Sequence, residues 1–168
     1  MGVNMILDDR IFEKLKVVFC GTAVGNRSAK LGAYYAGRGN KFWDVIHWAG
    51  LTPRRMQPQQ FKDLPEYGIG LTDLAKHCSG VDSQIGRDDF DVKAFRKKIE
   101  RYKPRVVAFN GKAAAKIFFG RSVVEYGLQT KAIGETAIFV LPSTSGAARR
   151  YWNEAYWIEL GKFLKRCR

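Results

Sequence analysis

Short apolar runs alternate along the chain with segments whose apolar residues recur at helical spacing. Runs rich in β-branched residues predict buried strands, since such residues pack well on a pleated surface. Three runs are clear, and a fourth begins as a strand and continues as a loop. They are Lys16–Cys20, Arg105–Gly111 and Thr136–Pro142, and then Ile69–Ala75.

Helical spacing marks the segments between these strands. One helix carries Phe42, Val45, Ile46 and Ala49 and stops at Gly50; another carries Val92, Phe95, Ile99 and Tyr102 and ends before Pro104. Shorter helices are predicted in Pro58–Gly68 and Lys112–Gly120, and a closing helix presents Trp152, Tyr156, Leu160, Phe163 and Cys167 on one face. Strands alternating with helices, without an internal repeat or a linker, predict one α/β domain over residues 1–168, a parallel sheet in a three-layer sandwich.

Within the composition, charge is the feature that points to a class of partner. Lys and Arg number 29 against 16 Asp and Glu, a net charge of +13 on 168 residues that are 46% hydrophobic. Such an excess on a folded domain favours a polyanion, most often nucleic acid, although a solvated cationic surface is the alternative. We expect that the protein binds no membrane, because no apolar run is long enough to span one and no signal peptide is evident. We also expect a monomer.

Cysteine and histidine positions argue against a metal site. Cys20, Cys78 and Cys167 are widely spaced and odd in number, which suits a reducing compartment. With only two histidines, no spacing resembles a zinc ligand set. We therefore expect a cytoplasmic protein, associated with the nucleoid if bacterial, that has no metal and no cofactor.

Candidate chemistry lies in the segments that follow the strands, because parallel α/β sheets place sites there. Gly21–Ala29 has glycines and hydroxyls, but it lacks the spacing of a dinucleotide fingerprint or a P-loop. Lys112 is either part of a helix start or a phosphate contact. The loop Ser143–Arg150 is either a solvated basic corner or a DNA-contacting loop, in which small residues allow close approach and arginines neutralise phosphates.

Five stretches taken in order carry a family resemblance: VVFCGTAVGNRSA, NKFWDVIHWAGLTP, YGIGLTDL, FNGKAA and VLPSTSGAAR. Together they resemble the mismatch-specific uracil/thymine-DNA glycosylases, the Mug/TDG branch of the uracil-DNA glycosylase superfamily. The resemblance runs from about Lys16 to Arg150. It implies one α/β domain that flips a damaged base out of DNA and cleaves its N-glycosidic bond. The implied substrate is double-stranded DNA, with single strands as an open alternative, and no cofactor is implied.

The resemblance assigns roles one residue at a time. In the first family motif an Asn positions the hydrolytic water, and Ala23 stands at that position here. Ala147 stands where a bulkier residue fills the gap left by the flipped base, so Arg149 or Arg150 is the candidate to replace it. The expected base pocket comprises Gly21, Thr22, Ala23, Tyr35, Asn40 and Ser143, and the expected DNA contacts are Lys112, Ser145, Gly146, Ala147, Arg149 and Arg150.

Two of these expectations leave alternatives. Tyr35 falls where the family places an aromatic residue that stacks on the base. The alternative for both Tyr34 and Tyr35 is that they pack in the core. Asp73 stands where the family has Asn or Lys, and a carboxylate there is a candidate general base that also stabilises an oxocarbenium-like transition state. The alternative is an Asp that caps the following turn.

The sequence therefore predicts a monofunctional DNA glycosylase acting on uracil first, with hypoxanthine and xanthine as further candidates. Such an enzyme would flip the base out of DNA and hydrolyse its N-glycosidic bond, which initiates base excision repair. One alternative is a catalytically impaired relative that binds DNA or lesions, because Ala23 replaces the water-positioning Asn. Another is a small-nucleotide-binding α/β protein that uses the turn Gly21–Gly25.

Overall fold

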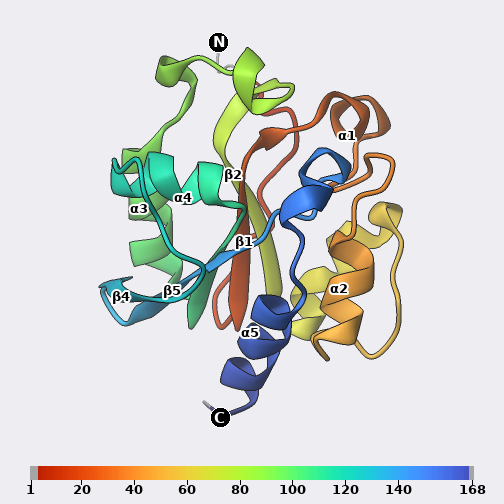
Figure 1. Cartoon of the computed structure of the whole chain (residues 1–168), viewed down its shortest axis with the longest axis vertical. Helices are drawn as coiled ribbons and strands as arrows, with labels where there is room; N and C mark the ends of the chain where they lie inside the picture. Colours follow the sequence, from red (N-terminus) through yellow and green to blue (C-terminus); the bar gives the residue numbers. More distant parts are fainter. Residues whose placement is uncertain (1–3, 167–168) are drawn as a thin grey trace.

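The computed structural model describes residues 4–166, which form a five-stranded sheet with helices on both faces (Figure 1). The strand order is β2-β1-β3-β5-β4. Strands β1, β2, β3 and β5 pair in parallel, and β4 pairs antiparallel with β5 at one edge. The strands are β1 (Val17–Val24), β2 (Ile69–Ser79), β3 (Val106–Asn110), β4 (Gly127–Ile133) and β5 (Thr136–Leu141).

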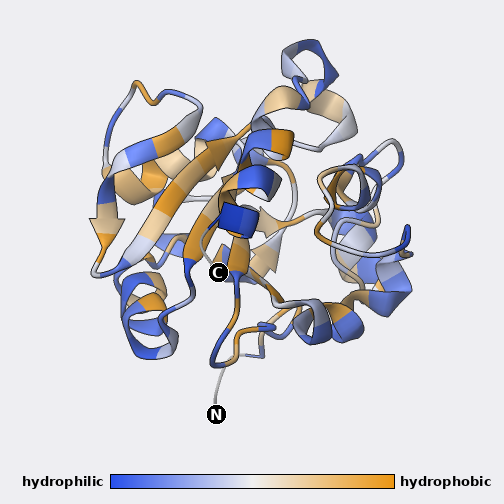
Figure 2. Ribbon diagram, turned by 90° about the horizontal axis from the view of Figure 1, so that it is seen from below, coloured by the Kyte–Doolittle hydropathy of each residue, from blue (hydrophilic) through white to orange (hydrophobic). Residues whose placement is uncertain are grey.

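Two separate apolar cores lie on the two faces of the sheet (Figures 1 and 2). The helices α3 and α4 pack on one face, while α2 and α5 cover the other. This arrangement confirms the predicted three-layer α/β sandwich. The helices are α1 (Asn26–Leu31), α2 (Phe42–Trp48), α3 (Val92–Tyr102), α4 (Lys112–Phe119) and α5 (Ala155–Arg166), with 3-10 turns η1 (Pro58–Tyr67), η2 (Asp82–Gln84), η3 (Arg87–Asp89) and η4 (Gly146–Tyr151).

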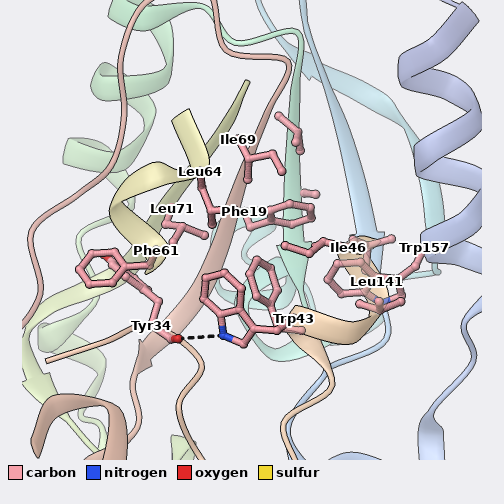
Figure 3. Packing of buried hydrophobic residues seen from close by; sticks show 14 of the residues in the cluster. Phe19, Tyr34, Trp43, Ile46, Phe61, Leu64, Ile69, Leu71, Leu141 and Trp157 are labelled. Carbon is pink, nitrogen blue, oxygen red and sulfur yellow. Dashed lines mark hydrogen bonds between the residues drawn. The ribbon is translucent and has the colours of Figure 1, made fainter. Parts of the chain in front are cut away.

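Large aromatic residues fill the core beneath α2 and α5 (Figure 3). Phe19 of β1 stacks on Trp157 with ring centroids 5.4 Å apart and meets Phe42 edge-on at 5.3 Å. The Trp43 indole N–H donates a 3.2 Å hydrogen bond to the backbone oxygen of Tyr34. Such aromatic packing adds to area burial, and here it fixes the start of α2 and the preceding loop against β1.

The central strands extend further than the sequence analysis predicted. Strand β1 continues to Val24 and β2 continues to Ser79, so the predictions of a loop beginning at Gly21 and of a loop in the later part of Ile69–Ala75 were wrong. Parallel pairing between the two strands explains the extension, because the ladder satisfies backbone groups that the short apolar runs do not mark. Gly21, Thr22, Ala23 and Asp73 consequently sit on strands rather than on loops.

Other elements also differ from the predictions. Strand β4 and helix α1 were not predicted, and β4 makes the sheet mixed rather than wholly parallel. The stripe predicted for the closing helix is correct in part: Leu160 is buried, and Trp152, Tyr156 and Phe163 are partly buried against the same core. Helix α5 begins at Ala155, so Trp152 lies before it, and its other buried residues are Trp157, Gly161 and Leu164. Cys167, which was predicted on the same stripe, lies outside the described residues.

The N-terminal segment covers the outer edge of β2. Arg10 and Leu71 exchange backbone hydrogen bonds of 2.9 and 3.0 Å, and the Ile6 amide donates to the Lys76 carbonyl at 2.9 Å. An exposed edge strand offers unpaired groups to other chains, and this segment occupies those groups. It also carries Asp9 to the flank of β2.

Helix α5 approaches α2 so closely that only glycine fits at Gly161. A Cβ atom there would lie 2.1 Å from the backbone oxygen of Ala49. We predict that Gly161→Ala lowers the free energy of unfolding by about 1–3 kcal/mol, because overpacking forces the helices apart. Denaturant unfolding measures the loss. Gly37→Ala, at a position with no atom within 4 Å of the added methyl, is the control, and equal stability of both variants would contradict the prediction.

Candidate active site

Three side-chain positions form one row across the carboxyl ends of β2, β1 and β3. Asp73 on β2 is the register partner of Gly21 on β1. On the other side of β1, Phe109 of β3 pairs with Cys20, so the next residue, Asn110, comes level with Gly21. Paired residues of parallel strands point to the same face, and alternation puts this row on the face of Phe19 and the aromatic core. The row is therefore a feature of strand register rather than of loop conformation.

Glycine at position 21 makes room for the Asp73 carboxylate. A Cβ atom on Gly21 would lie 2.7 Å from Asp73 Oδ1, closer than real contacts allow. Ala23 and its partner Ala75 follow on the same face, and both carry only a methyl group. Small residues thus surround the carboxylate along the two strands.

Asp73 is a buried carboxylate that is incompletely neutralised. Its residue is 4% exposed, and Oδ2 lies 3.8 Å from Lys76 Nζ without a hydrogen-bond partner among the described residues. Burial raises the pKa of Asp73 to about 6; Asp9 adds to the rise, and Lys76 and Lys98 oppose it. The predicted alternative of a turn cap was wrong, because Asp73 lies within β2 and Oδ2 accepts no backbone N–H.

Tyr35 lies over this row in a strained backbone conformation. Its φ of 53° is in the left-handed region, and its ring stacks on Phe42 with centroids 4.1 Å apart. The hydroxyl is buried near Gly21 and faces Asn110 without a hydrogen bond of normal geometry. Burial, and next Asp73, raise the pKa of Tyr35, so the phenol stays neutral. Phe42 covers one face of the ring, which leaves only the opposite face for a base.

Tyr34 has a different environment and is part of the core. The residue is 2% exposed, and its ring contacts Phe61 edge-on at 5.4 Å. Its hydroxyl accepts a hydrogen bond from Lys76 Nζ at 3.1 Å and donates to the Asp8 carbonyl at the same distance. Of the two neighbouring tyrosines, only Tyr35 keeps a polar atom without a partner in the part of the chain described here.

Asn110 and Thr144 join two of the predicted site segments, and neither was predicted. Asn110 Nδ2 donates to Thr144 Oγ1 at 2.9 Å, and the Thr144 amide donates to Asn110 Oδ1 at 3.0 Å. The Thr144 carbonyl accepts from the Lys41 amide at 2.9 Å. An Asn at the end of a buried strand was the available signal for Asn110. These bonds hold the end of β3, the loop before α2 and the segment after β5 together.

Three predicted pocket residues use their polar side chains within the protein. Thr22 Oγ1 donates to Asp82 Oδ1 at 2.6 Å, which brings a second carboxylate beside the end of β1. Asn40 Oδ1 accepts from the Phe42 amide at 3.0 Å, and Ser143 Oγ accepts from the Ser145 amide at 3.2 Å. Asn40 thus supports the start of α2, and Ser143 shapes the loop that follows β5. Their pocket roles stay predictions.

The segment predicted to contact DNA is partly a 3-10 turn. Ser145 accepts from the Ala147 amide at the start of η4, and Arg149 and Arg150 of η4 are exposed. Gly146 allows close contact with the loop before α2, because a Cβ atom there would lie 2.8 Å from the Arg38 carbonyl oxygen. Lys112 is the first residue of α4, directly after Gly111, and its Nζ lies 4.3 Å from the centre of the Tyr126 ring.

The main cavity of the described residues lies away from Asp73, and these residues contain no cluster suited to a metal ion. A cavity of about 820 Å³ opens at the opposite end of the sheet, beside Lys103–Arg105 and Gly134–Ala137. It lies at the amino ends of β3 and β5, far from Asp73 along the strands. Within residues 4–166, no group of three or more His, Cys, Asp or Glu side chains is placed to hold a metal ion. No helix in this range is long and apolar enough to cross a membrane.

The raised pKa of Asp73 predicts a stability effect of Asp73→Asn. Because the folded-state pKa of Asp73 lies above the ordinary 3.8, ionisation of Asp73 lowers the stability of the folded state. The full loss of stability applies above about pH 6, and there is no loss below about pH 4. The amide mimics the neutral acid, so we expect a gain of on the order of 1–3 kcal/mol in unfolding free energy at pH 7.5. The gain should shrink at pH 4.5 in denaturant titrations. A loss at pH 7.5 would instead identify Asp73 as a structural ion-pair partner.

Comparison with known proteins assigns the chain to a family. The model of the uracil DNA glycosylase superfamily matches residues 10–164. An NMR structure from Methanosarcina acetivorans, of a protein provisionally named as a uracil DNA glycosylase, is 23% identical, with a TM-score of 0.63, and the match covers 97% of this chain and 98% of that one. At this identity the structural likeness shows the shared fold. The family match spans nearly the whole chain, and the protein therefore belongs to the uracil DNA glycosylase superfamily.

Proposed function

We propose that this protein is a monofunctional DNA glycosylase of the mismatch-specific uracil/thymine branch, which hydrolyses the N-glycosidic bond of a deaminated base flipped out of DNA. Uracil is the first candidate base, with hypoxanthine and xanthine next. The superfamily match supports DNA glycosylase activity in general, and the net charge of +13 suits a DNA substrate. The observation that carries the proposal is the buried Asp73 carboxylate, which is placed against Gly21 and has an oxygen without a partner among the described residues.

Asp73 supplies the acid–base chemistry in this proposal. A water oxygen attacks C1′ of the deoxyribose, and one water proton passes to the Asp73 carboxylate. The C1′–N bond breaks with its electron pair going to the base, which leaves as an anion and takes up a proton from solvent, while Asp73 returns its proton to solvent. The products are the free base and an abasic site. A carboxylate whose pKa is about 6 is largely ionised at neutral pH yet basic enough to accept this proton. The same negative charge stabilises the oxocarbenium-like sugar in the transition state.

Ala23 favours the alternative of an impaired, lesion-binding relative. If it occupies the position of the water-holding Asn, the ordinary water contact is missing from β1. Asp73 compensates in our proposal, because Gly21 is its register partner and Ala23 lies two residues further along the same face. A protein without base release from any damaged DNA would be the lesion-binding relative.

We predict that Asp73→Asn lowers the single-turnover rate of uracil release about 100- to 10,000-fold, because the amide cannot accept the proton. Shape and size are kept, so DNA affinity should change little. The assay uses an end-labelled uracil-containing oligonucleotide, with alkali to cleave abasic sites. The wild-type rate should rise with pH through about pH 6.

Ala23→Asn in the Asp73→Asn background is the matched second variant. It places an amide that can hold water on the same face, and partial recovery of the rate would support a shared water position. A near-normal rate in Asp73→Asn alone would end the role of Asp73 as base. Parallel substrates containing thymine mispairs, hypoxanthine or xanthine identify the preferred base.

We also predict that Arg149→Ala and Arg150→Ala each weaken DNA binding without regard to sequence. Both side chains are exposed on η4, beside the segment that carries Ser143. Loss of one phosphate contact should reduce the slope of log K against log salt concentration by about one. Fluorescence anisotropy across a salt series measures the slope. Lys93→Ala on α3, an exposed charge on the other layer, is the control, and slopes equal to the control would place both arginines outside the interface.

A further inference from the structure

Behind Asp73, four charged side chains form a chain that runs to helix α3. Lys76 Nζ lies 3.8 Å from Asp73 Oδ2 and 3.0 Å from Asp9 Oδ1, and Asp9 Oδ2 pairs with Lys98 of α3. Lys76 is 8% exposed, and the side chains of Asp9 and Lys98 are 15% and 22% exposed. Two positive and two negative charges are thus placed alternately in a mostly buried chain, with Asp73 at its end.

Lys76 is held by groups other than Asp73. Its Nζ contacts Asp9 at 3.0 Å and donates to the Tyr34 hydroxyl at 3.1 Å. Asp9 is fixed in turn by Thr72, whose hydroxyl donates to Oδ1 at 2.7 Å, and by Lys98. Burial alone would raise the pKa of Asp9, but Lys76, Lys98 and Thr72 together lower it, so Asp9 is ionised whenever Asp73 titrates. Lys76 therefore acts on Asp73 across 3.8 Å while bonded to Asp9.

We propose that Lys76 is a positioning residue for the reaction, which together with Asp9 fixes how readily the Asp73 carboxylate accepts a proton. Lys76 attracts a negative charge on Asp73, and Asp9 opposes it. The longer distance to Asp73 leaves its carboxylate only partly neutralised, as a base requires. A direct ion pair at 2.8 Å would make the carboxylate a much weaker base. This inference rests on the proposed role of Asp73 as the base.

The other groups facing Asp73 do not titrate in the relevant range. Cys20 precedes Gly21 on β1 and points to the opposite face of the sheet, and Tyr34 and Tyr35 lie on the side of the aromatic core. Burial, and then Asp73, raise the pKa of all three groups, which stay neutral. The charges that act on Asp73 are therefore Lys76, Asp9 and Lys98.

Two substitutions should shift the pH dependence of base release in opposite directions. Lys76→Met removes the nearest positive charge, so the acid limb of the single-turnover rate should move up by about one pH unit. Asp9→Asn removes the opposing negative charge, so the limb should move down. Lys97→Met, an exposed charge on α3, is the control with the same loss of charge and should leave the limb in place.

Direct titration of the carboxyl separates this inference from the proposed function. In protein labelled with 13C at the Asp carboxyls, the Asp73 signal is the one missing from Asp73→Asn. Opposite shifts of this titration in the two variants support the inference, and unchanged titrations in folded variants overturn it. Shifted titrations with an unmoved rate profile would confirm the charge network and reject Asp73 as the base. If Lys76→Met does not fold, Asp9→Asn decides alone: a downward shift supports the inference, and no shift overturns it.

Discussion

The parallel register of β1 against β2 is the constraint on which the site depends. It places Gly21 opposite Asp73, and the missing Cβ lets the carboxylate lie against the neighbouring strand. A slip of one residue would turn every side chain of the slipped strand to the other face. It would move Phe19 out of the aromatic core if β1 slipped, or Asp73 away from Tyr35 if β2 slipped. Because the same alternation buries Phe19 and presents Asp73, the packing of the core beneath α2 and α5 also fixes the geometry of the candidate base.

The charged groups around Asp73 determine how readily its carboxyl group ionises. A buried carboxylate without full hydrogen bonding destabilises a fold, and proteins usually avoid one unless it is paired. Here the partner is present but is bonded elsewhere, since Lys76 is tied to Asp9 and Tyr34. The N-terminal segment is essential to the arrangement because it brings Asp9 to the edge of β2. If Asp73 is the base that we propose, stability and activity make opposing demands on this residue: a neutral side chain suits the fold, and the carboxylate suits the reaction.

The sequence predicted the layers of the fold and the main helices, since buried strands and helical stripes follow directly from side-chain periodicity. It underestimated β1 and β2, because glycine, threonine and aspartate at their ends look like loop residues although the ladder continues through them. Strand β4 was missed because only its first and last residues are buried, so it lacks an apolar run. Asp73 could be singled out from its residue type and motif, and its role as the base stays a prediction. Asp9 could not be singled out, because its link to Lys76 joins positions 67 residues apart in the chain through a segment without regular structure.

The small residues at positions 21, 23 and 75 link the strand register to the environment of the Asp73 carboxylate. If a catalytic group occupied position 23, a water molecule would be held from β1, and Asp73 would face a competing polar side chain on its own face of the sheet. Methyl groups at Ala23 and Ala75 remove that competition and leave the carboxylate as the polar side chain that these two strands present there. In our proposal the water-activating group lies on β2 rather than on β1, and there it is 3.8 Å from Lys76 Nζ. The small side chains on β1 and the buried carboxylate on β2 are thus parts of one arrangement on adjacent strands.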